Sequence, residues 1–164
     1  MPGYTVELLD AHDYPEETGD TFAENARAKA LYGRSVAAGG SWLLGEDSGL
    51  EVDALGGAPG VQTARWAEGK HVERILAVLA DADDRRARYV CELVALAPDG
   101  RELRGTGTLE GHIAREPRGT AGFGFDPVFV PDGEEQTVAE LGDAWKAERS
   151  HRARAARALL AQLG

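Results

Sequence analysis

The sequence predicts a mixed α/β fold in a single domain, residues 1–164, with helices around a partly antiparallel sheet. Helical and strand patterns alternate through the first half of the chain, and a long hairpin pattern occupies the second half. A length of 164 residues suits one domain with a sizeable core. No internal repeat, low-complexity tract or linker divides the chain.

The composition is that of a soluble globular protein, with 43% hydrophobic and 28% charged residues. No apolar run approaches the ~20 residues that cross a bilayer, and the N-terminus has no secretion-signal pattern. A net charge of −10 repels nucleic-acid backbones, so we expect neither a membrane nor a nucleic-acid partner. The single cysteine, Cys91, lies in an apolar run and favours a buried thiol in a reducing cytoplasm.

A strand, a loop and a helix are expected first. The alternation in residues 4–9 predicts a short strand, and a polar loop with Pro and Gly follows it. The helix begins at Thr21, which forms a capping box with Glu24. Gly39 and Gly40 offer its C-terminal stop.

Two strands and an amphipathic helix come next. Residues 41–45 predict a short buried strand that leads into a pair of acids, and residues 50–55 predict an alternating strand. Residues 71–82 carry apolar side chains at helical spacing, so we expect an amphipathic helix there.

A hairpin dominates the second half. Residues 87–113 predict two strands joined at a Pro-Asp-Gly turn. A short strand within residues 125–133 ends at another Pro-Asp-Gly turn. The last helix is predicted over residues 143–163, with alanine and leucine side chains along its apolar side.

The first candidate site is the run Glu46-Asp47-Ser48-Gly49 at the end of an apolar stretch. Carboxylates near an interior require a cation, because an unpaired buried charge is strongly destabilising. Mg²⁺ suits such hard oxygen ligands. A strand-end turn with solvated acids is the alternative. Glu16 and Glu17 form another acidic pair, for which a plain solvated loop is the preferred interpretation if that stretch is taken alone.

The second candidate is residues 118–127, which are rich in glycine and contain two phenylalanines. Glycine lets the backbone approach a ligand closely, and Phe123 and Phe125 offer flat faces for a stacked base. The alternative for both rings is ordinary core packing.

The third candidate lies near the C-terminus. Lys146 and Ser150 are spaced to share one face of the predicted helix, and His151 and Arg152 follow directly. Cations and a hydroxyl at one helix end suit phosphates or an oxygen-bearing base. A solvated basic helix face is the alternative.

Four segments occur in a fixed order: "TFAENARAKA", "EDSGLEVDALGGAPGVQTARWA", "REPRGTAGFGFDPVFVP" and "AELGDAWKAERSHRARA". Together they resemble the inosine/xanthosine triphosphate pyrophosphatase family, over residues 4–164. The resemblance implies an elongated α/β fold with a mixed sheet, two lobes, a central cleft and a homodimer. It also implies hydrolysis of dITP, ITP or XTP to the monophosphate and pyrophosphate with Mg²⁺.

The resemblance assigns roles to individual residues. Asp47 matches the general base and a metal-site acid, Glu16 matches the other metal ligand, and Ser48 matches a substrate contact. The remaining matches are substrate contacts that hold the base or line the cleft: Phe123, Gly124, Phe125, Asp126, Lys146, His151, Arg152 and Lys29.

The chemistry of the substrate fits these residues. A triphosphate needs cations to screen its charge, and an acid beside Mg²⁺ can accept a proton from the attacking water. Lys29 would stabilise the leaving pyrophosphate. Hypoxanthine and xanthine carry an acceptor at position 6, which suits the donors His151 and Arg152, whereas an adenine amino group would leave those donors unpaired.

The chain also departs from the family pattern. We expect the first strand and helix of the fold, with their T-x-N-x-x-K motif, to be absent before Tyr4, and Glu46 stands where the family has Asp. Such a loss would favour a second hypothesis, a non-catalytic nucleotide-binding or dimerisation remnant. A third is a pyrophosphatase for other altered nucleotides, such as methylated pyrimidines.

Overall fold

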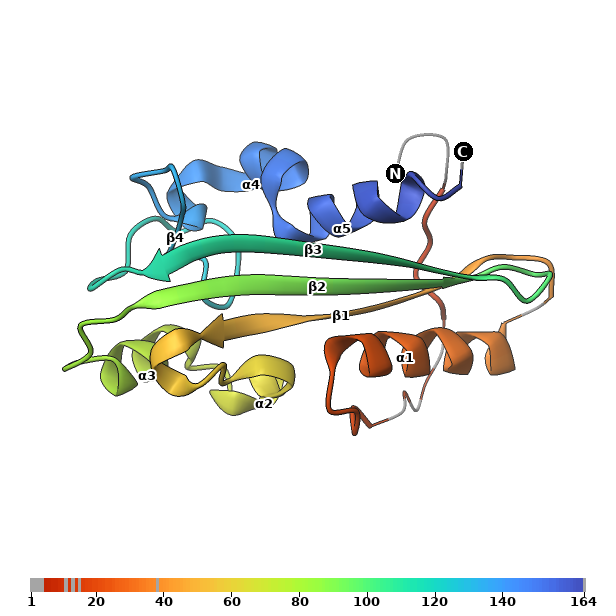
Figure 1. Ribbon diagram of the computed structural model, residues 1–164, viewed down its shortest axis with the longest axis horizontal. Coiled ribbons are helices and arrows are strands. Elements are labelled where there is room, and N and C mark those ends of the chain that lie inside the picture. Colours follow the sequence, from red (N-terminus) through yellow and green to blue (C-terminus); the bar gives the residue numbers. More distant parts are fainter. Residues whose placement is uncertain (1–4, 11, 13, 15, 38, 164) are drawn as a thin grey trace.

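The computed structural model describes residues 5–10, 12, 14, 16–37 and 39–163. Its centre is a four-stranded sheet in the order β1-β2-β3-β4, with every pairing between these strands antiparallel. The strands are β1 (Leu43–Val52), β2 (Arg86–Leu96), β3 (Glu102–Ile113) and β4 (Phe129–Pro131). Figure 1 shows β1, β2 and β3 running side by side along the long axis of the molecule, between helices. The predicted α/β fold with an elongated sheet flanked by helices is therefore confirmed, but among the described residues the sheet is antiparallel throughout rather than mixed.

Helix α1 (Phe22–Val36) covers one face of the sheet. Its capping box is present as predicted, because Thr21 accepts a hydrogen bond from the Glu24 amide while the Glu24 carboxylate accepts one from the Thr21 amide. The helix ends at Val36, before the predicted glycine stop. Its small buried residues pack against β1 and β2 in a compact cluster of Ala26, Ala30, Leu43, Val94 and Leu96.

The opposite face carries α4 (Val138–Arg149) and α5 (His151–Leu160). Helix α5 lies unusually close to β3, because a Cβ atom at Gly105 or Gly107 would clash with the α5 backbone. Cys91 is fully buried beneath this helix, as predicted, and burial raises the pKa of its thiol.

A second core forms where short helices pack against the other end of the sheet. These are η1 (Asp53–Leu55), η2 (Gly60–Gln62), α2 (Thr63–Trp66) and α3 (His71–Val78). Helix α3 begins at the predicted residue but ends at Val78, four residues before the predicted end, and the hairpin is confirmed at close to its predicted bounds. The buried side chains of this core come from strands, α3 and the segment before β4: Leu50, Val52, Ile75, Leu79, Tyr89, Leu109, Ile113, Phe125, Val128 and Phe129.

The prediction of a strand over residues 4–9 is wrong for residues 5–9; Tyr4 lies outside the described residues. Residues 5–10 form no strand pairing. Val6 and Leu8 are exposed to 60% and 101%. Alternation alone does not make a strand, since a strand also needs a partner for its backbone groups and a surface for its apolar side.

The two strands predicted at 41–45 and 50–55 are one continuous strand, β1, so the acidic run is not a strand-end turn. Glu46 and Asp47 pair with Leu93 and Glu92, midway along the pairing of β1 with β2. Gly45 lets β1 continue, because a Cβ at this position would clash with the carbonyl oxygen of Ala26 in α1. The glycine is thus a close-packing residue rather than a turn residue.

The single helix predicted over residues 143–163 is two helices, α4 and α5. Ser150 interrupts them with extended backbone (φ −62°, ψ 162°), and its hydroxyl accepts a hydrogen bond from the Ala153 amide as the N-cap of α5. Lys146 and Ser150 therefore do not share one helix face. Serine competes well for such capping positions, and the chain turns toward the sheet there.

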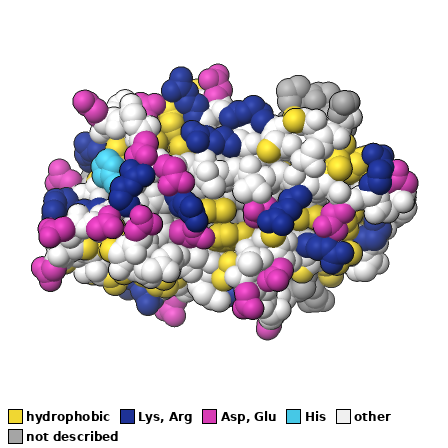
Figure 2. All heavy atoms as spheres, in the orientation of Figure 1, with side chains coloured by type: hydrophobic (Ala, Val, Ile, Leu, Met, Phe, Trp, Pro, Cys, Tyr) yellow, Lys and Arg dark blue, Asp and Glu magenta, His cyan; other side chains and the backbone are white. Residues whose placement is uncertain are grey.

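Across the described residues, no helix combines the length and the apolar character that crossing a membrane requires. On the face shown in Figure 2, acidic and basic side chains are interspersed, and no continuous basic patch covers it.

Candidate active site

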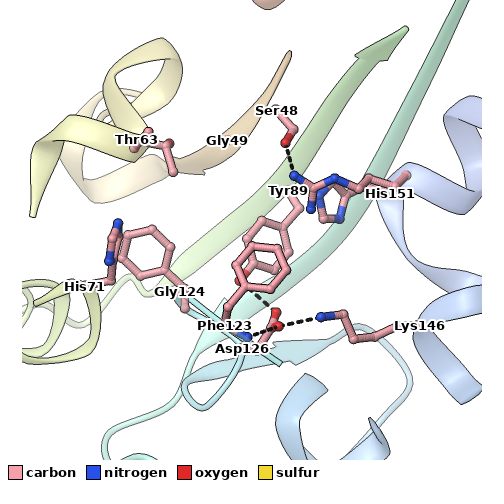
Figure 3. Close-up of a pocket in the computed structure, with 13 residues that line it drawn as sticks. Ser48, Gly49, Thr63, His71, Tyr89, Phe123, Gly124, Asp126, Lys146 and His151 are labelled. Atoms are coloured by element: carbon pink, nitrogen blue, oxygen red, sulfur yellow. Dashed lines mark hydrogen bonds and ion pairs between the residues drawn. The ribbon is translucent and has the colours of Figure 1, made fainter. Parts of the chain in front are cut away.

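A pocket of about 410 Å³ lies between two groups of helices. One side comes from β1, α2 and α3, and the other from α4, α5 and the segment before β4. This is the position of the cleft between two lobes that the resemblance implied. Figure 3 shows the side chains that converge on it. The lining residues are Ser48, Gly49, Thr63, Ala64, His71, Tyr89, Phe123, Gly124, Phe125, Asp126, Lys146, His151 and Arg152.

Asp126 is the polar centre of this pocket. Its carboxylate is buried and accepts hydrogen bonds from Lys146 Nζ at 2.7 Å, from the Phe123 amide at 2.9 Å and from the Tyr89 hydroxyl at 3.3 Å (Figure 3). Burial, together with the neighbouring Asp126 charge, raises the pKa of Tyr89 well above its usual value. Tyr89 therefore stays protonated and acts as a donor, and the carboxylate is held from three directions.

The two phenylalanines have different surroundings. Phe123 is 65% exposed, with Lys146 Nζ 4.7 Å and Arg152 Cζ 5.5 Å from its ring centre. Phe125 is 2% exposed and packs edge-on against His71 at 5.1 Å. Gly124 between them has a positive φ of 60°, a conformation that favours glycine. Phe123 thus offers an open ring face, while Phe125 forms part of the core beneath the pocket.

His151 lies flat against Tyr89, with ring centres 4.7 Å apart and planes 16° from parallel. Its side chain is buried, and among the described residues its Nδ1 atom has no hydrogen-bond partner. Burial, assisted by the charges of Arg152, Lys146 and Arg154, lowers the pKa of His151 to about 3. The imidazole is therefore neutral near pH 7 and has one N–H group to donate.

The Arg152 side chain, on α5, forms hydrogen bonds to two side chains of β1. Its Nη2 atom donates to Ser48 Oγ at 2.7 Å, and its Nε atom donates to Glu46 Oε1 at 3.1 Å. These two contacts orient the guanidinium beside Phe123. Glu46, which the sequence analysis placed in the first candidate site without a specific role, thus helps to position a predicted substrate-binding residue.

Asp47 does not line this pocket. Successive strand residues point to opposite faces, so the Asp47 side chain turns toward α1 while Ser48 turns toward α5. Its carboxylate is buried and accepts hydrogen bonds from Lys29 Nζ at 2.8 Å and Asn25 Nδ2 at 3.1 Å. Burial raises the pKa of Asp47, although the Lys29 and Asn25 hydrogen bonds offset part of this shift.

Lys29 joins a second acid to this cluster. Its ammonium lies 2.6 Å from Glu17 Oε1 and donates to the Glu46 backbone oxygen at 3.0 Å. Burial by itself lowers the pKa of Lys29, but the hydrogen bonds and charges of Asp47 and Glu17 outweigh it and raise the pKa. The acid that meets Lys29 is Glu17, whereas the side chain of the predicted ligand Glu16 is exposed.

Sequence reasoning missed Asn25 and Tyr89, and it named Glu17 only as part of an acidic pair in which Glu16 was the expected metal ligand. The spacing of Asn25 and Lys29, one helical turn apart, could have indicated that both reach the same strand residue. A second hydrogen bond orients the Asn25 side-chain amide, because the Gly19 backbone amide donates to Asn25 Oδ1 at 2.8 Å. No pattern in the sequence indicates that Tyr89 donates a hydrogen bond to Asp126, because alternation predicts only that its side chain is buried in the sheet.

The sequence profile of the Ham1 family matches residues 2–162, nearly the whole chain. The chain belongs to the Ham1 family. Two curated relatives are named dITP/XTP pyrophosphatase. The relative from Gloeobacter violaceus is 47% identical over 161 residues, with 96% of this chain and 81% of the relative covered. The relative from Symbiobacterium thermophilum is 48% identical over 161 residues, with 93% and 79% covered.

Solved structures of Ham1 proteins share the fold. The Staphylococcus aureus Ham1 protein superposes with a TM-score of 0.82 at 38% identity, covering 90% of this chain and 79% of that one. A Mycobacterium abscessus protein titled nucleoside-triphosphatase / dITP/XTP pyrophosphatase gives a TM-score of 0.74 at 40% identity, covering 96% and 82%. These comparisons establish the family and confirm the fold class.

The donors near Asp47 fit a divalent cation in this Ham1-family chain. No group of three or more His, Cys, Asp or Glu side chains gathers anywhere in the described part of the chain. However, Mg²⁺ is commonly held by only one or two carboxylates, with water and substrate phosphate completing its shell. The carboxylates of Asp47 and Glu17 and the Glu46 carbonyl already converge on one positive charge, the Lys29 ammonium.

Proposed function

We propose that this protein hydrolyses non-canonical purine nucleoside triphosphates, of the dITP and XTP class, to the monophosphate and pyrophosphate. The observation that carries the proposal is the juxtaposition on β1: Ser48 faces a pocket suited to a purine base, and the adjacent Asp47 belongs to a carboxylate cluster suited to phosphate chemistry. The names of the relatives support the same substrate class.

The base would stack on the open face of Phe123 in the 410 Å³ pocket. Lys146 and Arg152 lie near that ring and are cationic hydrogen-bond donors, and His151 in the same pocket lining is a neutral donor. A 6-oxo purine accepts hydrogen bonds at this edge, whereas the amino group of adenine would face these donors with another donor. An unpaired buried donor is costly, so the pocket favours hypoxanthine and xanthine.

The phosphates would cross β1 at Ser48 and reach Asp47 on the other face. Water attacks the α-phosphorus there, the bond from that phosphorus to the bridging oxygen breaks, and pyrophosphate leaves. Asp47 would accept the proton of the attacking water, for which its raised pKa is suitable. Bound Mg²⁺ supplies charge neutralisation and polarisation of the phosphate oxygens. Asp47 and Glu17, with the Glu46 carbonyl, would hold it.

Glu16 and Glu17 form a matched pair for testing the metal ligand. The family resemblance points to Glu16, and the contact with Lys29 points to Glu17. We expect Glu17→Gln to weaken Mg²⁺ binding more than Glu16→Gln, measured by calorimetric titration with MgCl₂. The opposite order would assign the ligand to Glu16.

The proposal also covers the cellular location and the oligomeric state of the protein. The family resemblance supports a cytoplasmic enzyme and a homodimer. Light scattering coupled to size-exclusion chromatography should then give about twice the chain mass of 17.5 kDa. A mass equal to one chain would contradict the dimer.

A direct assay tests the function. The chain is incubated with Mg²⁺ and separately with dITP, XTP, dATP and dGTP, and released pyrophosphate is measured. We expect hydrolysis of dITP and XTP with clear preference over dATP. Nucleotide binding without pyrophosphate release would instead identify a non-catalytic binding module, and preference for a modified pyrimidine triphosphate in an added arm would identify another substrate class.

A further inference from the structure

The ammonium of Lys29 occupies a point where three oxygens meet. It lies 2.6 Å from Glu17 Oε1, 2.8 Å from Asp47 Oδ1 and 3.0 Å from the Glu46 backbone oxygen. Two carboxylates and a carbonyl are the donors that a hard divalent cation takes. A lysine charge thus sits inside the donor set that the proposed function assigns to Mg²⁺.

We propose that Lys29 is a positioning residue that stands in for the divalent cation, holding Glu17 and Asp47 together before the ion binds and leaving them when it does. The proposal rests on the proposed function, because it takes this cluster as the site of the ion. It adds that Lys29 and the ion compete for the same oxygens.

The competition follows from space and charge. Mg²⁺ binds oxygen at about 2.0–2.1 Å, so an ion shared by the same Glu17 and Asp47 oxygens would occupy the region that the Lys29 ammonium now fills. Two positive charges at that distance also repel each other in a partly buried site. The two cations therefore cannot share these oxygens at once.

The cluster is divided into a fixed part and a part that can move. Asp47 is only 7% exposed at its side chain and keeps the Asn25 hydrogen bond on its second oxygen when Lys29 leaves. Lys29 is 26% exposed and has a long flexible stem that can carry its charge outward. The released ammonium then becomes available to the phosphates of a substrate.

Magnesium titration of metal-binding variants gives the first test. We expect Lys29→Met to bind Mg²⁺ about tenfold more tightly than the native chain, because the variant leaves two carboxylates without their internal cation. Isothermal titration with MgCl₂ alone measures the affinity, and thermal unfolding with and without MgCl₂ should show a larger Mg²⁺-dependent rise in Tm for the variant. The exposed Lys70→Met is the matched control and should behave as the native chain. Equal or weaker Mg²⁺ binding by Lys29→Met would overturn the proposal.

A second measurement covers the case in which Lys29→Met does not fold. The chain has three lysines, Lys29, Lys70 and Lys146, so ¹³C-lysine labelling gives three side-chain signals in NMR spectra, with Lys29→Arg to assign the first. We expect MgCl₂ to shift the Lys29 signal toward that of exposed Lys70, while the signal of Lys146, paired with Asp126, stays in place. An unmoved Lys29 signal at saturating MgCl₂, or a native chain that binds no Mg²⁺, overturns the proposal.

The outcome separates this inference from the proposed function. Pyrophosphate release from dITP with an unmoved Lys29 signal would leave the function standing and remove the inference. A Lys29 signal that shifts with MgCl₂, in a chain that hydrolyses none of the nucleotides, would support the displacement and reject the function.

Discussion

The two faces of β1 carry two differently prepared centres. On the α5 side, the Phe123 pocket has an open cavity, a neutral His151 and an Asp126 carboxylate held by three donors. On the α1 side, both Asp47 oxygens, Glu17 Oε1 and the Glu46 backbone oxygen are already paired with Lys29 or Asn25. Under the proposed function, the pocket can receive a base without moving its charges, whereas the carboxylates of Asp47 and Glu17 must exchange Lys29 for Mg²⁺. Recognition of the base and chemistry at the phosphates would then have different reorganisation requirements.

The largest effect is expected on the carboxylate side. Asp47→Asn removes the proton acceptor and the charge of a proposed Mg²⁺ ligand while keeping the side-chain shape, so at saturating Mg²⁺ kcat for dITP should fall by about 10²–10⁴-fold with little change in KM. Steady-state pyrophosphate assays measure both constants, and Asp53→Asn, at an exposed position in η1, is the control. A native kcat in Asp47→Asn would show that the chemistry does not depend on this face.

The pocket side should respond in KM instead. Phe123→Ala removes the open ring, and a stacked base is worth about 1–3 kcal/mol, so KM for dITP should rise roughly 5- to 150-fold with kcat nearly unchanged. Trp42→Ala, at a partly exposed aromatic residue outside the pocket lining, is the control. If Phe123→Ala lowered kcat and left KM in place, the division of labour between the two faces would be wrong.

The neutral His151 should make stability depend on pH. In the unfolded chain the imidazole binds a proton below pH 6.5, whereas in the folded chain it does so only below about 3. The unfolded state therefore binds more protons between these values, and stability falls as the pH is lowered through that window, by about 1.4 kcal/mol per pH unit for one proton.

Urea denaturation at pH 4, 5, 6 and 7 measures this slope. His151→Gln should flatten the slope by about one proton, and His12→Gln, at an exposed side chain, should leave it unchanged. The same slope in His151→Gln as in the native chain would mean that the buried imidazole does not resist protonation.

The smallest effect is expected from Tyr89→Phe. This change removes the hydroxyl that donates to Asp126 and keeps the ring that stacks on His151. A typical net hydrogen-bond contribution of about 0.5–1.5 kcal/mol predicts a KM for dITP that is roughly 2- to 10-fold higher. Tyr14→Phe, whose exposed hydroxyl donates to the Leu9 carbonyl, is the control. An unchanged KM would show that Asp126 needs only two donors.

Much of the fold could be predicted because its signals are local. The Thr21 capping box and the hairpin turn depend on residues a few positions apart, and both occur as expected. The continuity of β1 and the break at Ser150 could not be predicted in this way. Gly45 resembles a turn residue until α1 is packed on it, and Ser150 resembles a helical residue until the chain must bend toward the sheet.

The site was predictable to a similar extent. Lys146, His151 and Arg152 were expected together and do line one pocket with Phe123. The placement of Asp47 on the opposite face depends on β1 being continuous, so the error in the strand prediction also hid the partners of Asp47. Glu17 lies in a loop, where sequence spacing does not determine which of two neighbouring acids turns inward.

Because glycine has no Cβ atom, Gly105 and Gly107 determine how closely α5 packs against the sheet. His151 and Arg152, which we propose contact the base, lie at the start of α5, so the distance between this helix and the sheet sets the width of the pocket. A methyl group added at Gly105 or Gly107 would push the start of α5, with His151 and Arg152, away from the sheet. Nucleotide preference in such a protein can therefore drift through substitutions on the buried floor, while every residue that touches the substrate stays the same.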